Sequence, residues 1–259
     1  MAGMTVMDLL DAKGERPIAY VQVAREEEAV AAAEAGMDMI GTAFLPERAH
    51  FARAVPGTHF QFGLPWGQHA DATEALRGAM AAMGAGAQSV YCGMSPAIVE
   101  VLAREGVPVI CHVGLVPPKA TWTGGYRAVG RTLEQAKAVW RQVRDFEAAG
   151  AFAVEMEVVA ADLAAEITRR TSMLTISLGS GGGCDAQYLF SADLLGENRG
   201  HVPRHAKTYR NFAAERDRLQ AERVAAYREY IDDVVNGSFP EDRHGVAMKG
   251  DALREVWED

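Results

Sequence analysis

The sequence predicts an α/β protein folded as a (β/α)8 TIM barrel, and three observations support this fold class. First, the chain has 259 residues, which is the usual length of one such barrel. Second, alanine-rich helical stretches alternate with short apolar runs along the chain. Third, these runs are almost continuously apolar, as in parallel strands that helices cover. A doubly wound open sheet has the same alternation, but the length and the number of strands favour the barrel.

A glycine closes many of the helical stretches. Gly36, Gly86, Gly106 and Gly150 each end a helical pattern and precede an apolar run within a few residues. Glycine fits the left-handed conformation that commonly follows the last turn of a helix. The repeat therefore indicates successive helix–strand units, from which a parallel barrel is built.

The apolar runs give eight expected strands in chain order. They cover residues 18–23, 37–42, 59–64, 88–92, 108–113, 152–158, 174–178 and, from the weakest pattern, about 194–201. Residues from about 204 to 259 are expected to form a helical extension, whose charges are typical of a helix face in contact with water. We expect a single domain over 1–259 that comprises the barrel and this extension.

The composition favours a soluble globular protein. Hydrophobic residues make up 49% of the chain and charged residues 24%, which is ordinary for such proteins. No apolar stretch approaches the roughly 20 residues that cross a bilayer. Residues 1–10 show neither the basic region nor the apolar core of a secretory signal. We therefore expect a cytoplasmic protein without membrane contact.

Charge and cysteine content narrow the range of ligands. The net charge of −9 at pH 7 argues against binding to nucleic acids or anionic membranes, which carry charge of the same sign. The three cysteines lack metal-type spacing, and their odd number argues against a disulfide framework. A small anionic substrate would therefore have to be held by local arginines or backbone amides.

The stretch after the fifth expected strand has the composition of a catalytic loop. The apolar run 107–111 ends at His112, and prolines and paired glycines follow before Arg127. In TIM barrels the active site lies at the carboxyl ends of the strands. His112 is therefore a candidate catalytic residue that could donate to an oxyanion or accept a proton, although a structural histidine fits equally well. Arg127 is a candidate for binding a substrate carboxylate.

Several short motifs occur in a fixed order along nearly the whole chain. They are His112-Val113-Gly114-Leu115 with Pro117, Gly124-Gly125-Tyr126-Arg127 with Gly130-Arg131, Gly200-His201-Val202-Pro203-Arg204 with Ala206-Lys207, and Asn236-Gly237-Ser238-Phe239-Pro240 with His244. In this order and spacing, the sequence resembles the ketopantoate hydroxymethyltransferase family. That family belongs to the phosphoenolpyruvate mutase and isocitrate lyase superfamily of barrels.

The resemblance implies an activity and its cofactors. The family transfers a hydroxymethyl group from methylene-tetrahydrofolate to an α-keto acid, and a magnesium ion held by two aspartates steadies the enolate. In the register of the resemblance, Thr42 and Gly63 stand where the two aspartates would be. Methylene-tetrahydrofolate is thus a possible cofactor, whereas magnesium is doubtful because its carboxylate ligands are replaced. A displaced metal site could still form from Glu155, Glu157, His112 or Asp185, or from His59 and Gln61, which share a strand face with Gly63.

One catalytic group of the family is retained. The family's general base, a glutamate on strand six, corresponds to Glu157. Glu157 ends an apolar strand, where partial burial would raise its carboxyl pKa and suit it to proton transfer near neutrality. A carboxylate in an ion pair is the structural alternative. Glu155 lies two residues earlier on the same strand face, so the two carboxyls could share a proton or bind a cation.

The remaining candidates come from other strand ends and loops. Tyr91 takes the place of the family's lysine and could donate its hydroxyl to an enolate, although a packed aromatic is the simpler interpretation. A glycine-rich loop after the seventh strand could turn its backbone amides toward an anion. The substrate-binding candidates besides Arg127 are Thr42, Ala43, Gly63, Gly179, Ser180 and Gly181.

Together these observations predict a divergent hydroxymethyltransferase-like enzyme. It would form or cleave carbon–carbon bonds in an aldol-type reaction on a small α-keto acid or related carboxylate. Two alternatives stay open: a non-catalytic barrel that binds a carboxylate or scaffolds an assembly, and a metal-independent hydrolase or isomerase. The resemblance also implies a homo-oligomer in which C-terminal helices pack on neighbouring subunits.

Overall fold

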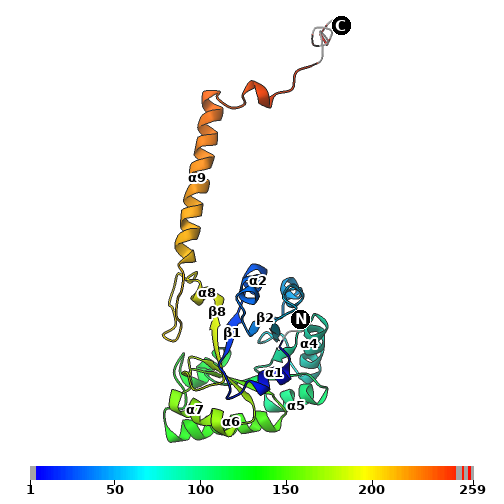
Figure 1. Ribbon diagram of the computed structural model, residues 1–259, viewed down its shortest axis with the longest axis vertical. Coiled ribbons are helices and arrows are strands. Elements are labelled where there is room, and N and C mark those ends of the chain that lie inside the picture. The colour runs from blue at the N-terminus through cyan, green and yellow to red at the C-terminus, as the bar shows by residue number, and fades with distance from the viewer. Residues whose placement is uncertain (1–3, 249–252, 254–255, 258–259) are drawn as a thin grey trace. The chain divides into compact units, whose positions relative to one another are not determined.

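The computed structural model describes residues 4–248, 253 and 256–257. The chain divides into two compact units, Met1–Arg210 and Asn211–Asp259, near the expected start of the C-terminal extension. In the first unit, eight parallel strands form a closed barrel in which each strand pairs with the next and β8 pairs with β1 (Figure 1). The strands are β1 (Ile18–Gln22), β2 (Met39–Ala43), β3 (His59–Gly63), β4 (Ser89–Tyr91), β5 (Val109–Gly114), β6 (Ala153–Glu157), β7 (Leu174–Leu178) and β8 (Ala186–Phe190). The predicted TIM barrel is confirmed.

Helices cover the outside of the barrel and its amino end. They are α1 (Val6–Asp11), α2 (Glu26–Glu34), α3 (Phe51–Ala54), α4 (Ala72–Gly84), α5 (Pro96–Arg104), α6 (Leu133–Ala148), α7 (Ala161–Arg170) and α8 (Ser191–Leu194), with short 3-10 helices η1 (Pro46–Arg48) and η2 (Pro117–Thr123). Outward-facing strand residues such as Phe62, Val90 and Val109 pack with helix residues such as Val99 and Val143 in one apolar core. This layer buries the apolar runs that made the strands recognisable in the sequence.

A second, smaller core fills the inside of the barrel near the amino ends of its strands. Leu9 from α1 packs there with Ile18, Met39, Ile110 and Leu174. Because α1 and these first inward positions close this end of the barrel, the polar inward residues lie further along the strands. The carboxyl ends are therefore the open end of the barrel.

The eighth strand lies at Ala186–Phe190, and the prediction of a strand near 194–201 was wrong. The prediction assumed a helix before every strand, but residues 179–185 join β7 to β8 without one. β8 begins at Ala186, which pairs with Ile176 in β7. Because β7 ends only two residues later, at Leu178, the connection has to run back along a short part of that strand. Ser191–Leu194 forms α8 instead.

The glycines of this connection allow it to lie against α7. A Cβ atom at Gly181 would come within 2.7 Å of Ala161 Cβ, and one at Gly183 within 2.5 Å of Ala165 Cβ. Both distances are too short for real side chains. Close packing on α7 therefore accounts for glycine at these two positions.

Asp185 anchors the end of the same connection. Its Oδ2 atom accepts hydrogen bonds from the backbone and hydroxyl of Thr175 and pairs with Lys13 Nζ at 2.8 Å, and its side chain is only 4% exposed. Removing one partner of a buried ion pair typically costs about 3–5 kcal/mol. We expect Asp185→Ala to lower the free energy of unfolding in urea by this amount, whereas Glu34→Gln, at an exposed acid of α2, should change it little. An unchanged unfolding midpoint in the first variant would contradict the anchoring role.

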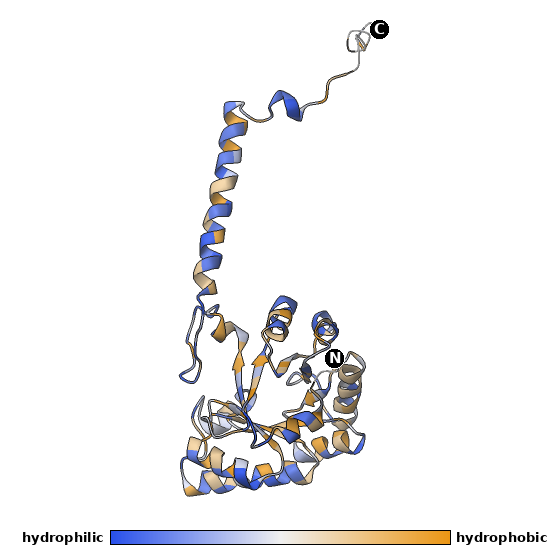
Figure 2. Cartoon of the chain, viewed as in Figure 1, coloured by the Kyte–Doolittle hydropathy of each residue, from blue (hydrophilic) through white to orange (hydrophobic). Residues whose placement is uncertain are grey.

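The second unit consists mainly of one long helix, α9 (Phe212–Asn236), which is followed by η3 (Asp242–His244). The side chain of Asn211 caps its start, and Gly237 ends it in the left-handed conformation. Hydrophilic and hydrophobic residues both occur along the whole helix (Figure 2), and nearly all of them are exposed. Within the described residues, no helix combines the length and the apolar character needed to span a membrane.

Candidate active site

The open end of the barrel contains a cavity of about 250 Å³. Its floor is formed by inward-facing residues at or near the carboxyl ends of the strands. These are Gln22, Ala43, Gln61, Gly63, Tyr91, His112, Glu155, Glu157, Leu178, Tyr188 and Phe190. Active sites of TIM barrels lie at this end, and the histidine and both glutamates of the cavity come from the neighbouring strands β5 and β6.

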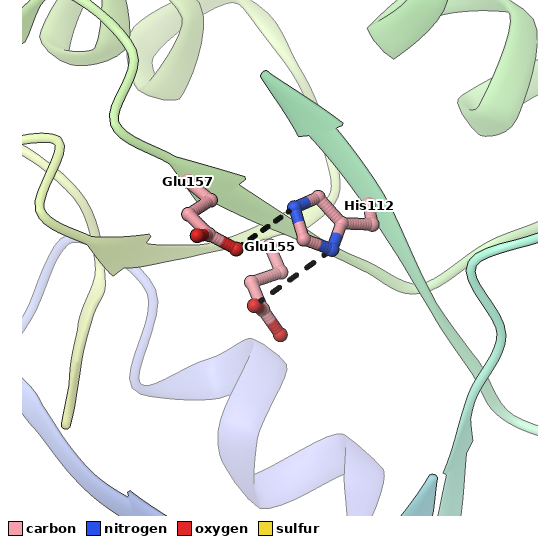
Figure 3. Close-up of side chains that lie close together, drawn as sticks. All are labelled: His112, Glu155 and Glu157. Atoms are coloured by element: carbon pink, nitrogen blue, oxygen red, sulfur yellow. Dashed lines mark ion pairs between the residues drawn. The ribbon is translucent and has the colours of Figure 1, made fainter. Parts of the chain in front are cut away.

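Two glutamates and a histidine form a cluster in this cavity. Glu155 and Glu157 lie two residues apart on β6 and face the same side, and His112 comes from the neighbouring strand β5. His112 Nδ1 lies 3.9 Å from Glu155 Oε1, and Nε2 lies 3.5 Å from Glu157 Oε2 (Figure 3). One potential ligand atom from each residue lies within 4.8 Å of the others. The structure thus brings together the two strongest catalytic candidates of the sequence and Glu155.

Hydrogen bonds fix the tautomer of His112. Its Nε2 lies 2.9 Å from the carbonyl oxygen of Leu115, and its Nδ1 lies 2.7 Å from the hydroxyl of Tyr91. Because a carbonyl oxygen only accepts, we assign the proton to Nε2, and Nδ1 then accepts from Tyr91. Burial lowers the pKa of His112 to about 4. His112 is therefore a neutral residue that positions Tyr91 and lies beside Glu157.

The two carboxyl groups have no arginine or lysine partner in the described part of the chain. Glu155 is 6% exposed. Burial, together with the nearby charge of Glu157, raises the pKa of Glu155 to about 8. Burial alone raises the pKa of Glu157 to about 7. Near neutrality the pair therefore holds about one proton, with Glu155 the more readily protonated member.

The backbone around Glu157 is held in an unusual conformation. The next residue, Val158, has a φ of 50°, a value that β-branched residues rarely adopt. Its amide donates to the carbonyl of Leu178 at 2.8 Å. The fully buried Ser180 hydroxyl donates to the carbonyl of Met156 and accepts from the amide of Val159. These bonds stabilise the strained end of β6 and so fix the position of Glu157.

The other candidates lie in different places. Ala43 and Gly63 line the cavity. Thr42 lies on the opposite face of β2, is fully buried and accepts a hydrogen bond from Arg48, because successive residues of a strand face opposite sides. The structure therefore does not bring Thr42 into the cavity. The Ser180 hydroxyl bonds to the backbone on either side of Glu157, and its place in the substrate site stays a prediction.

A larger cavity, of about 950 Å³, adjoins the cluster at Glu157. Arg127 lines it, together with Arg131, Arg204 and His205. These three arginines form no ion pair with an acidic residue among those described. The cavity is therefore a region of positive charge in a chain whose net charge is −9.

The glycine-rich loop after β7 borders a different cavity from the one that holds the two glutamates and His112. Gly179 and Gly181 border a smaller neighbouring cavity that also contains Arg204. The ring of His205 packs close to Gly179, since a Cβ at that glycine would lie 2.6 Å from Nδ1. Arg204 and His205 thus border both the loop and the arginine-lined cavity, while the loop meets the end of β6 through Ser180.

Sequence reasoning missed three polar residues inside the barrel, Gln22, Tyr20 and Tyr188, whereas it named Gln61 as a possible metal ligand. Gln22 accepts a hydrogen bond from the hydroxyl of Tyr188 at 2.8 Å, and the hydroxyl of Tyr20 donates to Gln61. Tyr20 and Tyr188 stack with their ring centroids 4.2 Å apart. Polar residues at alternate positions of apolar strands were the signal that could have identified them.

Comparisons with known proteins agree with this architecture. The family model for ketopantoate hydroxymethyltransferase matches residues 30–242. The 3-methyl-2-oxobutanoate hydroxymethyltransferase of Kosmotoga olearia is 32% identical over 261 residues, which cover 92% of this chain and 95% of the relative. The enzyme of the same name from Streptomyces coelicolor is 38% identical over 188 residues, or 71% of this chain and 62% of the relative. With the Enterococcus faecalis enzyme, 35% identical, the matched region spans 55% of the relative's length.

Solved structures share the fold at low sequence identity. A phosphonopyruvate hydrolase, solved in complex with oxalate and Mg²⁺, has a TM-score of 0.55 at 12% identity, with 98% of each chain covered. A 2,3-dimethylmalate lyase, described as a member of the PEP mutase/isocitrate lyase superfamily, has a TM-score of 0.51 at 14% identity, with 97% of this chain and 93% of that chain covered. The family model matches most of the chain, and the Kosmotoga relative aligns almost end to end. The chain therefore belongs to the ketopantoate hydroxymethyltransferase family.

Proposed function

We propose that this chain catalyses an aldol-type reaction that forms or cleaves the carbon–carbon bond next to the carbonyl of a small α-keto acid. One observation carries the proposal: Glu155 and Glu157 share one face of β6 inside the barrel cavity and have no cationic partner in the described chain. Such a pair supplies a base and an acid at adjacent positions. The names of the relatives suggest 3-methyl-2-oxobutanoate, which is α-ketoisovalerate, as the first substrate to test.

In the proposed mechanism Glu157 is the base. Its carboxylate removes the proton from C3 of the keto acid, and the C–H electron pair forms the C2–C3 double bond of an enolate. The neutral carboxyl of Glu155 donates a hydrogen bond to the enolate oxygen. C3 then attacks the carbon of formaldehyde, the C2 carbonyl is restored, and Glu157 returns its proton to the alkoxide that forms from the formaldehyde oxygen. With methylene-tetrahydrofolate as donor, one water molecule is also consumed, which supplies the hydroxyl oxygen and releases tetrahydrofolate. Methylene-tetrahydrofolate and formaldehyde are the donors to test.

His112 and Tyr91 act as positioning residues in this mechanism. Neutral His112 uses both ring nitrogens in hydrogen bonds, so it does not compete with the substrate for the proton on Glu157. It holds the Tyr91 hydroxyl at the edge of the cavity. We propose this orienting role for His112, whereas the sequence suggested that it donates to an oxyanion or accepts a proton.

We also propose that the arginine-lined cavity holds the carboxylate of a substrate. Glu157 borders both this cavity and the one inside the barrel, so an anion held by Arg127, Arg131 or Arg204 would lie next to the base. Arginine pairs well with carboxylates because its fork-shaped group can donate two parallel hydrogen bonds. The same cavity also favours the alternative function, a barrel that binds a carboxylate without turnover.

The family implies a magnesium ion, and the donor groups of this cavity decide whether one fits. The ends of β2 and β3 present Ala43 and Gly63, which carry no ligand atom in their side chains. His112 could bind a metal only by giving up a hydrogen bond. Two carboxyls remain, and Glu157 is the proposed base. The residues therefore do not fit a magnesium ion that leaves the base free.

We therefore expect product formation from α-ketoisovalerate and a one-carbon donor to be insensitive to metal removal. The rate should be the same in excess EDTA and after re-addition of Mg²⁺, as measured by NMR of the hydroxymethylated product. A rate restored only by Mg²⁺ would contradict the metal-free mechanism. A lack of both product and C3 proton exchange with solvent would contradict the proposed function.

Two further predictions concern the self-association of the protein and its location in the cell. The C-terminal helix α9 exposes apolar residues such as Leu219, Tyr227 and Ile231, which supports the proposal that the protein self-associates. The cytoplasmic location stays a prediction from the sequence.

A further inference from the structure

Two glutamines stand at the same level of the barrel wall, on either side of Gly41. Gln22 of β1 and Gln61 of β3 are both register partners of Gly41 in β2, and both side chains line the active-site cavity. The strand that carries Glu155 and Glu157, β6, lies four strands away from β2 in the closed barrel of eight. The two glutamines therefore face the proposed catalytic pair across the cavity.

A tyrosine hydroxyl bonds to the oxygen of each side-chain amide. The hydroxyl of Tyr188 donates to Gln22 Oε1 at 2.8 Å, and that of Tyr20 donates to Gln61 Oε1. The two tyrosine rings stack on each other and are buried. Burial, together with the charge of Glu155, holds the pKa of Tyr20 well above its usual value, so its hydroxyl keeps the proton that it donates. Each amide oxygen is thus oriented toward the tyrosine pair, which leaves the amide N–H bonds for another partner.

The contact between Tyr20 and Gln61 requires a glycine between them. A Cβ atom at Gly41 would lie 2.5 Å from the Tyr20 hydroxyl and 2.6 Å from Gln61 Oε1, and both distances are too short for a real side chain. Glycine inside a strand often marks such a close approach. Gly41 leaves the space in which a β1 hydroxyl reaches a β3 side chain across β2. Three neighbouring strands therefore fix the orientation of the Gln61 amide.

The Nε2 atom of Gln61 is open to the cavity. It forms no hydrogen bond with the described part of the chain, and a Cβ atom at Gly63, which lines the cavity two residues further along β3, would lie 3.5 Å from it. Gln61 is only 2% exposed. Its Nε2 is nevertheless not one of the wholly buried side-chain atoms without a partner, which are Arg25 Nε and His69 Nδ1 among the described residues. The space that Nε2 reaches is therefore the cavity that Gln61 lines.

Few other groups in this cavity can stabilise a negative charge. No arginine or lysine of the described chain lines it. His112 and Tyr91 already bond to each other and to the backbone. The Nε2 atom of Gln22, like that of Gln61, has no partner in the described chain. The two amides and the neutral carboxyl of Glu155 are thus available as donors to a negatively charged oxygen.

We propose that the amides of Gln22 and Gln61 donate hydrogen bonds to the oxygen on C2 of the keto acid and, with Glu155, form an oxyanion site. This inference rests on the proposed function. Negative charge develops on the C2 oxygen when Glu157 removes the C3 proton, and donors that are already oriented in a site shielded from water stabilise such charge strongly. The stacked tyrosine pair acts by positioning the amides.

Gln61→Leu tests the oxyanion site through the exchange of the C3 proton of α-ketoisovalerate in D₂O. The rate at saturating substrate should fall about 10- to 100-fold, as for the loss of one hydrogen bond to a charged oxygen. KM should change little, because the bond strengthens only as the charge develops. Gln142→Leu makes the same substitution at an exposed position of α6 and should leave the rate unchanged.

Two further variants separate the amide from its support. Tyr20→Phe retains the donor but releases its orientation, so its rate should lie between those of Gln61→Leu and the unchanged protein. The double variant Tyr20→Phe with Gln61→Leu removes both partners and leaves no buried hydroxyl without an acceptor, so it keeps the test decisive if Gln61→Leu alone does not fold. Its rate should be as low as that expected for Gln61→Leu.

A ¹³C NMR signal gives a readout that a change in packing does not produce. Hydrogen bonds to the C2 oxygen shift the signal of bound α-ketoisovalerate, labelled with ¹³C at C2, downfield of the free substrate, and this shift should shrink in Gln61→Leu. If the unchanged protein exchanges the proton but Gln61→Leu has the same rate, alters KM alone or keeps the full shift, the oxyanion site is refuted and the reaction stands. No exchange in the unchanged protein would refute the reaction and the inference with it.

Discussion

Replacing Glu157 by glutamine is expected to slow the exchange of the C3 proton of α-ketoisovalerate with solvent by about 10²–10⁴-fold, the usual effect of losing a general base. Glutamine preserves the size of the side chain but cannot accept the proton. Exchange measures enolate formation alone, so it needs no one-carbon donor. The methyl doublet of the substrate, followed by ¹H NMR in D₂O, reports the rate.

The structure gives this experiment a clear control. Glu134 is an exposed acid at the start of α6, and Glu134→Gln changes charge in the same way without altering the cavity. It should exchange substrate at the unchanged rate. Because Glu157 is mostly buried without an ionic partner, its replacement by a neutral amide should leave the protein folded, which circular dichroism can verify. Normal exchange in the Glu157 variant would place the base elsewhere.

The barrel was predictable because its repeat is local. Glycines such as Gly36 and Gly150 end helices beside apolar strands, and this signal needs only neighbouring residues. The eighth strand was missed because no helix precedes it. The anion-binding role of the glycine-rich loop stays a prediction, but the packing of Gly181 and Gly183 against α7 depends on contacts across the fold. Those contacts are not visible in a local pattern.

The active site was predictable only in part. Strand alternation correctly placed Glu155 and Glu157 on one face, since this needs no knowledge of other strands. By the same alternation, Thr42 and Ala43 face opposite sides of β2. A sequence register that is wrong by one position therefore assigns a candidate residue to the wrong face of the strand. The neutral state of His112 could not be foreseen, because it depends on the carbonyl of Leu115 and on the register between β4 and β5.

Glu155 should be as important as Glu157, although the family resemblance assigned it no role. Glu155→Leu removes the proposed donor to the enolate oxygen and should reduce the exchange rate by about 10²–10³-fold, as for the loss of an oxyanion donor. Glu155→Gln retains an N–H group that can donate to the same oxygen. It should therefore keep most of the activity that the leucine variant loses. Equal activity in the leucine variant and the unchanged protein would show that Glu155 does not contact the reacting oxygen.

The pH dependence distinguishes this role from simple packing. The exchange rate should rise as the pH increases through about 7, because Glu157 must lose its proton, and fall above about 8, because Glu155 must keep its own. These values describe the coupled pair rather than isolated groups. In Glu155→Gln the descending limb should disappear, since an amide does not titrate. A descending limb that persists in this variant would assign it to another group.

Protein stability should change with pH for the same reason. Because burial raises the pKa of Glu155 from 4.5 to about 8, the folded protein holds a proton that the unfolded chain has released between these values. Its contribution to stability is thus complete below pH 4.5 and is lost as the pH rises toward 8, at up to about 1.4 kcal/mol per pH unit. Urea unfolding should therefore show Glu155→Gln gaining stability relative to the unchanged protein between pH 5 and pH 8. A constant difference across this range would mean that Glu155 is ionised in the folded state and cannot serve as the hydrogen-bond donor.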